Sequence, residues 1–238
     1  MSEAKLTQGV EFLAEQGLNL FAVLPCETLP DNVSQTLLAE DIPLKDNRSL
    51  VLIGHGGRRL WQALTAFGMQ TADPVDHFSL VMTRRFVDEF LDSPPVLMLY
   101  PAGYTIPLQQ LGALAGWHHP SPLGLGINEN YGVWFAYRVA FLTTLSLPAT
   151  PNPQTLSPCD TCRDKPCLSA CPAQAVQGVG QFRVSACVDF RLQAQSVCQD
   201  RCLSRLACPV APEHRYELAQ LHYHYTHSLA SIRRYDRQ

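Results

Sequence analysis

Eight of the nine cysteines in this 238-residue chain lie within fifty residues, and they form two runs that each end in a Cys-Pro pair. The members of the first run are Cys159, Cys162, Cys167 and Cys171, followed by Pro172. The members of the second run are Cys187, Cys198, Cys202 and Cys208, followed by Pro209. Each cubane 4Fe–4S cluster takes four thiolates, so eight thiolates can hold two clusters. The spacing therefore predicts a protein with redox metal centres.

The composition restricts the classes of protein that this chain can belong to. The N-terminus carries acids and has no apolar core of a secretory signal, and no apolar run reaches the length of a spanning helix. We therefore expect a soluble cytoplasmic protein without a membrane partner, in which clustered cysteines are metal ligands rather than disulfides. The net charge of −3 and the absence of a Lys/Arg block argue against nucleic acid as a partner.

The segment 148–158 contains four prolines and predicts a linker between two domains, 1–150 and 151–238. The first domain alternates helical and strand patterns, which predicts an α+β fold. The expected helices are 3–16, 58–67, 73–92 and 107–116; the expected strands are 18–24, 49–54, 95–100, 123–127 and 133–145. The second domain is expected to end in a helix that packs back onto the first.

The first cysteine run resembles the run of bacterial ferredoxins, with two extra residues in its middle gap. In two-cluster ferredoxins the fourth cysteine of each run ligates the other cluster. The resemblance thus assigns one cluster to Cys159, Cys162, Cys167 and Cys208. It assigns the other to Cys171, Cys187, Cys198 and Cys202.

The alternative to iron–sulfur clusters is a pair of zinc sites with four cysteines each. Zinc sites favour two separated Cys-x-x-Cys pairs and do not need Cys-Pro, so the pattern favours iron–sulfur. The ninth cysteine, Cys26, stands alone and is expected to be a small buried apolar residue.

Two segments of the first domain resemble cobalamin-processing proteins of the CblC type and the related domain of epoxyqueuosine reductases and reductive dehalogenases. Asp73-Pro74-Val75-Asp76-His77 resembles the start of a long helix in those proteins, and the segment 126–138 resembles their stretch that lines the corrin. With the PSPLGLxIxxxYGxW segment before the cysteines, the whole chain resembles small bacterial ferredoxin-like proteins.

The resemblance implies a nitroreductase-like (CblC-type) sandwich domain followed by a small bacterial-ferredoxin-like double-cluster domain. It also implies a pocket for cobalamin beside two clusters that feed it electrons. The predicted pocket residues are Trp117, Ile127, Gly132, Trp134, Phe135, Tyr137 and Arg138. A continuous apolar run of this kind is also typical of a buried strand, so part of this set can be core.

These features together predict an oxidoreductase that passes single electrons to a corrinoid or another small-molecule cofactor, with a small redox protein or reductase as electron donor. Neither known activity transfers directly, because Tyr104 or Thr105 stands where epoxyqueuosine reductases carry an Asp, and Ala113 where CblC-type proteins carry a His. A flavin-linked reductase and an electron carrier without its own substrate are the alternatives.

Overall fold

The computed structural model describes residues 2–152 and 155–235 of the chain. These residues form two compact units. The first, here called the sheet unit, comprises Met1–His118 and Phe135–Thr155. The second, here called the cysteine unit, comprises His119–Trp134 and Leu156–Gln238. Residues 119–134, which the sequence-based division at 150 assigns to the first domain, thus pack with the cysteines.

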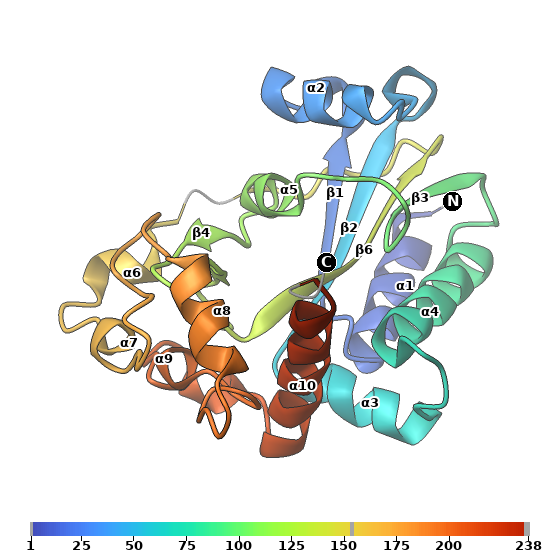
Figure 1. The fold of residues 1–238 in the computed structure, drawn as a ribbon. Coiled ribbons are helices and arrows are strands. Elements are labelled where there is room, and N and C mark those ends of the chain that lie inside the picture. Colours follow the sequence, from blue (N-terminus) through green and yellow to red (C-terminus); the bar gives the residue numbers. More distant parts are fainter. Residues whose placement is uncertain (1, 153–154, 236–238) are drawn as a thin grey trace. The chain divides into compact units, whose positions relative to one another are not determined.

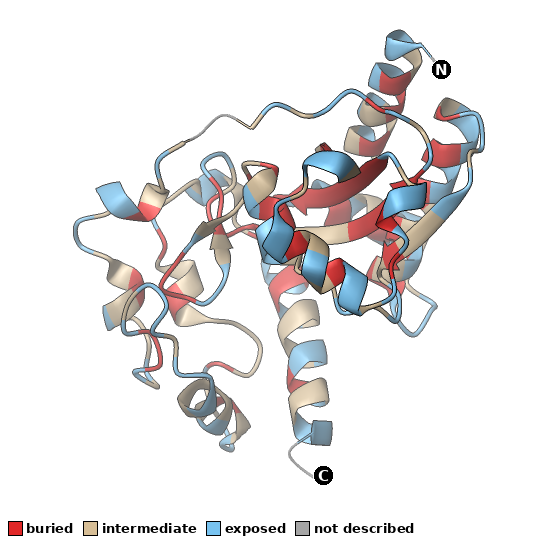
Figure 2. Ribbon diagram, turned by 90° about the horizontal axis from the view of Figure 1, so that it is seen from above, coloured by how far each residue is buried: buried red, intermediate tan, exposed pale blue. Residues whose placement is uncertain are grey.

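The sheet unit is built on four antiparallel strands in the order β1-β2-β6-β3 (Figure 1). Their bounds are β1 Leu20–Pro25, β2 Ser49–Gly56, β3 Val96–Tyr100 and β6 Phe135–Thr143. Every residue of the central strand β2 is buried, and its register places Leu52 opposite both Ala22 and Ala140. Figure 2 shows this sheet mostly in the colour of buried residues. The core of the unit lies around it.

Among its described residues, the sheet unit contains five helices. They are α1 Glu3–Glu15, α2 Asp31–Ala39, α3 Arg59–Phe67, α4 Pro74–Phe90 and α5 Leu108–Leu114. Helix α1 packs against α4, α4 also contacts α3 and β6, and α3 contacts β2 (Figure 1). Two short 3-10 turns, Cys26–Thr28 and Leu44–Asp46, precede and follow α2.

The boundaries of two helices follow from local chemistry. Helix α1 is followed by Gly17, whose φ of +83° suits glycine, as the sequence predicts. Helix α4 begins with Pro74 at its first position after Asp73, although the Asp73 side chain makes no capping hydrogen bond. The predicted beginning of α4 is therefore right, but its stabilisation comes from proline rather than from the carboxylate.

The cysteine unit has short elements. They are β4 His119–Pro120, β5 Gly126–Ile127, α6 Pro158–Thr161, α7 Pro166–Ser169, α8 Val184–Leu192, α9 Leu203–Leu206, the 3-10 turn Pro212–His214, and α10 Leu218–Tyr235. Strands β4 and β5 pair with each other, α7 packs on α9, and α10 on α8. Its core joins Trp134, Tyr216 and Leu221 to the thiols of Cys159, Cys167 and Cys208.

Several expectations differ from the structure in detail. The sequence did not indicate α2, and the side chain of Phe67, expected to face inward, is 47% exposed. The two strands expected around 123–127 and 133–145 lie in different sheets: β5 pairs with β4, and β6 pairs with β2 and β3. The described part of the 148–158 linker has no helix or strand before Pro158, and residues 153–154 of it lie outside the described residues.

Within the described residues, no helix combines the length and the apolar character needed to cross a bilayer.

Candidate metal centre

Short helices that begin with proline present the thiols of the first run. Pro158 is the first residue of α6, and the Ser157 side chain caps this helix by accepting from the amide of Cys159 (3.3 Å). Cys162 follows the last turn of α6, and Cys167 is the second residue of α7, again after a proline. The Ser157 cap and the two prolines fix the backbone from which the sulfur atoms project.

The second run follows a similar scheme with longer gaps. Cys187 lies in α8 and Cys198 follows it, while Cys202 caps α9 and its Sγ accepts from the amide of Arg205 (3.4 Å). Cys208 follows α9, just as Cys171 follows α7. Since α7 packs against α9, the two runs are joined at the helices that precede their last cysteines.

Four thiols, here called group one, act on one another electrostatically: Cys159, Cys162, Cys167 and Cys208. Burial raises the pKa of the Cys159 thiol to about 11, and the nearby sulfur atoms of the other three members raise it as well. Burial likewise raises the pKa of Cys167, with contributions from Cys208 and Cys162. The group therefore draws three members from the first run and one from the second.

The other four thiols, here called group two, form a second set: Cys171, Cys187, Cys198 and Cys202. Burial raises the pKa of the Cys187 thiol, and Cys202, Cys171 and Cys198 raise it further. The pKa of Cys198 is raised by burial and then by Cys202 and Cys171. These two sets of four are the same sets that the ferredoxin-like run assigns to two clusters.

All four thiols of group two line one cavity of about 430 Å³ within the cysteine unit. Most of the other walls are apolar, and they include Leu123, Val176 and Phe182. Three arginines, Arg191, Arg201 and Arg205, also border it. A largely apolar cavity lined by four thiols, with no carboxylate in its lining, fits a metal–sulfur group in its donor chemistry.

In the part of the chain that the structure describes, no three His, Cys, Asp or Glu side chains are placed to share a single metal ion. A cubane cluster bonds each thiolate to a different iron, so its ligands need not converge on one point.

Hydrogen bonds to sulfur distinguish Cys171 from the other thiols. Burial alone would raise its pKa, but donors from the nearby backbone amides, chiefly that of Ala175, bring the pKa below the ordinary value. The bond from the Ala175 amide is 3.3 Å long. This site favours a thiolate, which is the form that binds metal.

The seven residues predicted for a cofactor pocket divide between the two units. Ile127, Gly132 and Trp134 belong to the cysteine unit, and Trp134 is fully buried in its core beside the Tyr216 ring (5.4 Å between centroids). Gly132 has a φ of +56°, and a Cβ there would lie 2.4 Å from the Val210 carbonyl oxygen. These three residues thus pack within the cysteine unit, where the Trp134 Nε1 is buried without a hydrogen-bond partner among the described residues.

The remaining four, Trp117, Phe135, Tyr137 and Arg138, belong to the sheet unit. The Tyr137 hydroxyl lies 3.1 Å from Nδ1 of His118, and burial raises its pKa. The Nε of Arg138 donates to Nδ1 of the fully buried His55 (2.9 Å). A register shift between Ile53 and Gly54 places Gly54, rather than His55, opposite Tyr137.

The pocket prediction omitted a carboxylate close to this group. Burial raises the pKa of Asp76, in the first turn of α4, and the Arg138 charge opposes that rise. Arg138 and Asp76 also act on the Tyr100 hydroxyl. The sequence contained a signal for Asp76, because it lies in the segment that resembles the CblC-type helix start.

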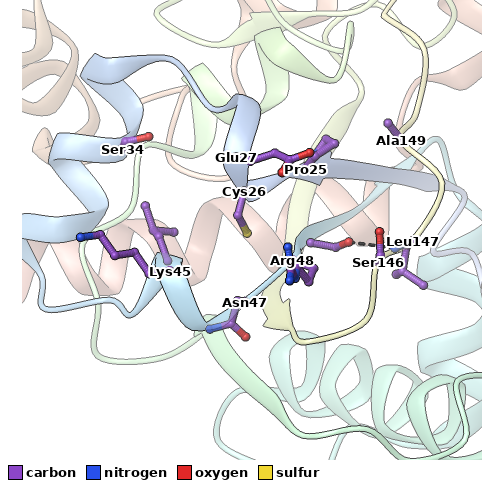
Figure 3. A pocket seen from close by; sticks show the side chains of 12 residues that line it. Pro25, Cys26, Glu27, Ser34, Lys45, Asn47, Arg48, Ser146, Leu147 and Ala149 are labelled. Atoms are coloured by element: carbon purple, nitrogen blue, oxygen red, sulfur yellow. Dashed lines mark hydrogen bonds between the residues drawn. The ribbon is translucent and has the colours of Figure 1, made fainter.

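A second cavity of about 530 Å³, in the sheet unit, is lined by Cys26 together with Glu27, Lys45 and Arg48 (Figure 3). One of its walls is fixed by the amide of Leu147, which donates to Ser49 (3.0 Å). Burial raises the pKa of the half-buried Cys26 thiol to about 11, so this thiol stays protonated at neutral pH and is a poor nucleophile.

No protein-family model matches this sequence, and no curated protein matches it. Solved structures are similar in fold. An epoxyqueuosine reductase solved with a tRNA-Tyr epoxyqueuosine-modified stem loop has a TM-score of 0.57 at 14% identity, covering 89% of this chain and 66% of that one. Epoxyqueuosine reductase from Streptococcus thermophilus has a TM-score of 0.58 at 15% identity, covering 86% of this chain and 65% of that one.

The B12-trafficking protein CblC from C. elegans has a TM-score of 0.51 at 12% identity, covering 94% of this chain and 92% of that one. The fold is thus a mixed α+β fold like those of epoxyqueuosine reductase and CblC. The chain spans about two thirds of the length of the epoxyqueuosine reductases that it resembles.

Proposed function

We propose that this chain is an iron–sulfur oxidoreductase that relays single electrons through two 4Fe–4S clusters to a cofactor in the sheet unit. Group one holds one cluster and group two the other. The observation that carries the proposal is the division of eight thiols into two sets of four, one of which lines a single cavity. A donor set of thiols alone suits iron–sulfur chemistry.

The clusters, when bound, would supply one-electron transfer, and the residues of the chain hold and tune them. Group one and group two provide the ligands. Amides of Ala175 and Arg205 donate to the sulfur atoms of Cys171 and Cys202, and bonds of this type shift the potential of a cluster. The apolar walls of the group two cavity keep water away from the centre. In this proposal the cysteine unit is a ferredoxin-like double-cluster domain and the sheet unit a nitroreductase-like one.

The proposed electron acceptor is a corrinoid, bound by the sheet unit through Trp117, Phe135, Tyr137 and Arg138. The fold likeness to a B12-trafficking protein supports this choice over flavin. The reaction would be one-electron reduction of cobalt or reductive removal of its upper ligand, with a small redox protein or reductase as donor. The net charge of −3 argues against tRNA or another nucleic acid as the substrate, because binding phosphates requires positive charge.

Metal analysis of protein purified without oxygen tests the clusters. We expect about eight irons and about eight sulfides per chain, and about four after Cys162→Ser or Cys198→Ser, because each change removes a ligand from one group only. Cys26→Ser is the matched control and should leave the iron content unchanged. Zinc in place of iron, or full iron in both ligand variants, would contradict the assignment.

Titration of the iron-loaded protein with cobalamin tests the acceptor. We expect a saturable change in the cobalt absorption spectrum, and about tenfold weaker binding in Phe135→Ala. Phe67→Ala, which removes an exposed ring of the same unit, should bind normally. If the acid extract contains flavin and the protein does not respond to cobalamin, the acceptor is a flavin rather than a corrinoid. If the extract contains no flavin and the protein does not respond to cobalamin, the chain is an electron carrier without its own substrate.

A further inference from the structure

Arg191, near the end of α8, carries a buried charge that only neutral groups contact. It is 8% exposed. Its Nε donates to the Cys198 carbonyl (3.2 Å), Nη1 to the Ser228 hydroxyl (3.1 Å) and Nη2 to the Tyr225 carbonyl (2.9 Å). The Tyr225 ring lies 5.3 Å from its guanidinium carbon. No carboxylate pairs with it among the ion pairs of the described residues.

Arg205, in α9, is half-buried and is likewise held by neutral groups. Its Nε and Nη2 both donate to the Val133 carbonyl (3.1 and 2.7 Å). Its guanidinium carbon lies 4.7 Å from the Trp134 ring centre and 4.8 Å from that of Tyr216. It, too, makes no ion pair with a carboxylate in the described part of the chain.

Both arginines border the group two cavity. Burial raises the pKa of Cys187 and of Cys198, whereas the Arg191 charge lowers both, so Arg191 acts on group two. Burial raises the pKa of Cys208 in group one, and the charges of Arg215 and Arg205 lower it. Both arginines thus lie beside the thiols of group two, which line the same cavity.

A buried cation without a counter-charge is costly, and proteins normally pair such a charge or place it beside a metal centre. The groups of opposite sign that line the same cavity as Arg191 and Arg205 would be the thiolates of group two once metal is bound. The third arginine of the cavity, Arg201, differs: Asp200 neutralises it through two hydrogen bonds of 2.8 Å, and its side chain is 42% exposed.

We propose that Arg191 and Arg205 set the reduction potential of the metal centre in the group two cavity. This inference rests on the proposed function. A fixed positive charge stabilises the more negative, reduced state of a nearby centre, so both residues raise the potential.

The test is a redox titration of the iron-loaded full-length protein, followed by electron paramagnetic resonance of the two reduced centres. For Arg191→Gln we expect the equilibrium constant for reduction of one centre to fall about tenfold, or 59 mV for a one-electron couple, with the other centre unchanged. Arg205→Gln should lower the potential of the same centre. Arg191→Lys should retain most of the wild-type potential, and Arg201→Gln, whose charge is already neutralised, should shift it less than about twofold.

A second pair of variants leaves the arginine in place. Ser228→Asp puts a carboxylate where the Ser228 hydroxyl now lies 3.1 Å from Nη1 of Arg191, and Ser228→Asn puts a neutral group of the same shape there. We expect Ser228→Asp to lower the potential of the same centre as Arg191→Gln, and Ser228→Asn to leave it within about twofold. This pair of variants tests the effect of the Arg191 charge on the potential even if Arg191→Gln does not retain iron.

The outcomes separate the two proposals. A wild-type protein without iron would overturn the proposed function. Iron-loaded variants whose potentials equal that of the wild type, or an Arg201→Gln shift as large as that of Arg191→Gln, would overturn the role of the arginines and leave the proposed function intact.

Discussion

Asp76 illustrates how one half-buried side chain can couple the stability of the sheet unit to pH. It occupies the third position of α4, where the helix macrodipole favours a negative charge. Burial disfavours that charge, and although Arg138 opposes this effect, the pKa of Asp76 is raised above 3.8. The net result is a carboxylate whose ionised form is less stable in the native protein than in the unfolded chain.

The sign of the pH dependence follows from this shift. Below the unfolded pKa both states are protonated and Asp76 contributes nothing. As the pH rises through the unfolded and then the native pKa, the unfolded chain ionises first and the native state loses stability. We therefore expect Asp76→Asn to be as stable as wild type at pH 3 and more stable at pH 7, by less than about 1 kcal/mol.

Urea unfolding of both proteins at several pH values measures this difference. An Asn variant that is less stable than wild type at pH 7 would show that the charge pair with Arg138 outweighs burial.

At the scale of elements, the packing of α1 on α4 depends on a glycine. A Cβ at Gly9 would lie 2.6 Å from Cε2 and 2.8 Å from Cδ2 of Phe86, and 2.8 Å from Cβ of Phe90. The Cβ of Phe90 is attached to the backbone of the facing helix, and the Phe86 ring is fully buried. Neither can make room for a Cβ at position 9 unless the helix shifts. The two helices therefore approach each other closely only because position 9 lacks a side chain.

We expect Gly9→Ala to destabilise the protein by up to about 2 kcal/mol, because an overpacking cost of about 1–3 kcal/mol is offset only in part by a gain of about 1 kcal/mol in helix propensity. Chemical unfolding checks the value. Gly103→Ala is the control, since a Cβ there meets nothing within 4 Å, and its stability should stay within about 0.5 kcal/mol of wild type. Equal stability of the two variants would contradict the close approach.

Prediction from sequence succeeded for elements with strong local signals. Apolar periodicity and end signals indicated α1 and α4, because Gly17 and Pro74 act on the backbone locally. Helix α2 carried no such signal, since it is short and begins at Asp31 without a side-chain cap hydrogen bond. Phe67 fits the apolar stripe of α3, yet it lies at the end of the helix and packs its ring edge-on against Phe78 while remaining half exposed.

For the whole molecule, local patterns could not predict where the chain passes from one unit to the other. Residues 133–145 form one apolar run in the sequence, but Trp134 belongs to the cysteine unit and Phe135 begins β6 of the sheet unit. No change in composition marks this point. The resemblance to two-cluster ferredoxins predicted the two sets of four thiols, and their role as cluster ligands stays a prediction. The sequence did not indicate the role proposed for Arg191 and Arg205, because that role depends on their position beside the thiols and on the lack of a paired carboxylate. Neither can be read from local sequence.

The different construction of the units predicts that they respond differently to loss of metal. The sheet unit has its own four-stranded core, whereas helices α6, α7 and α9 of the cysteine unit have four residues each and cannot persist without tertiary support. Three of the thiols also form part of the core of the cysteine unit. Metal binding and folding should therefore be coupled in this unit and not in the other.

Hydrogen exchange of the full-length protein before and after iron chelation measures this coupling. We expect the amides of α7, α8 and α9 to exchange at least about tenfold faster without iron, while those of β2 and β6 keep their protection. The variant that carries both Cys162→Ser and Cys198→Ser should exchange like the chelated wild type and should not respond to the chelator. Protection lost equally in both units would mean that the chain unfolds as one cooperative body. Protection kept in both would mean that the thiols hold their places through protein packing alone, and that metal is added to a site already formed.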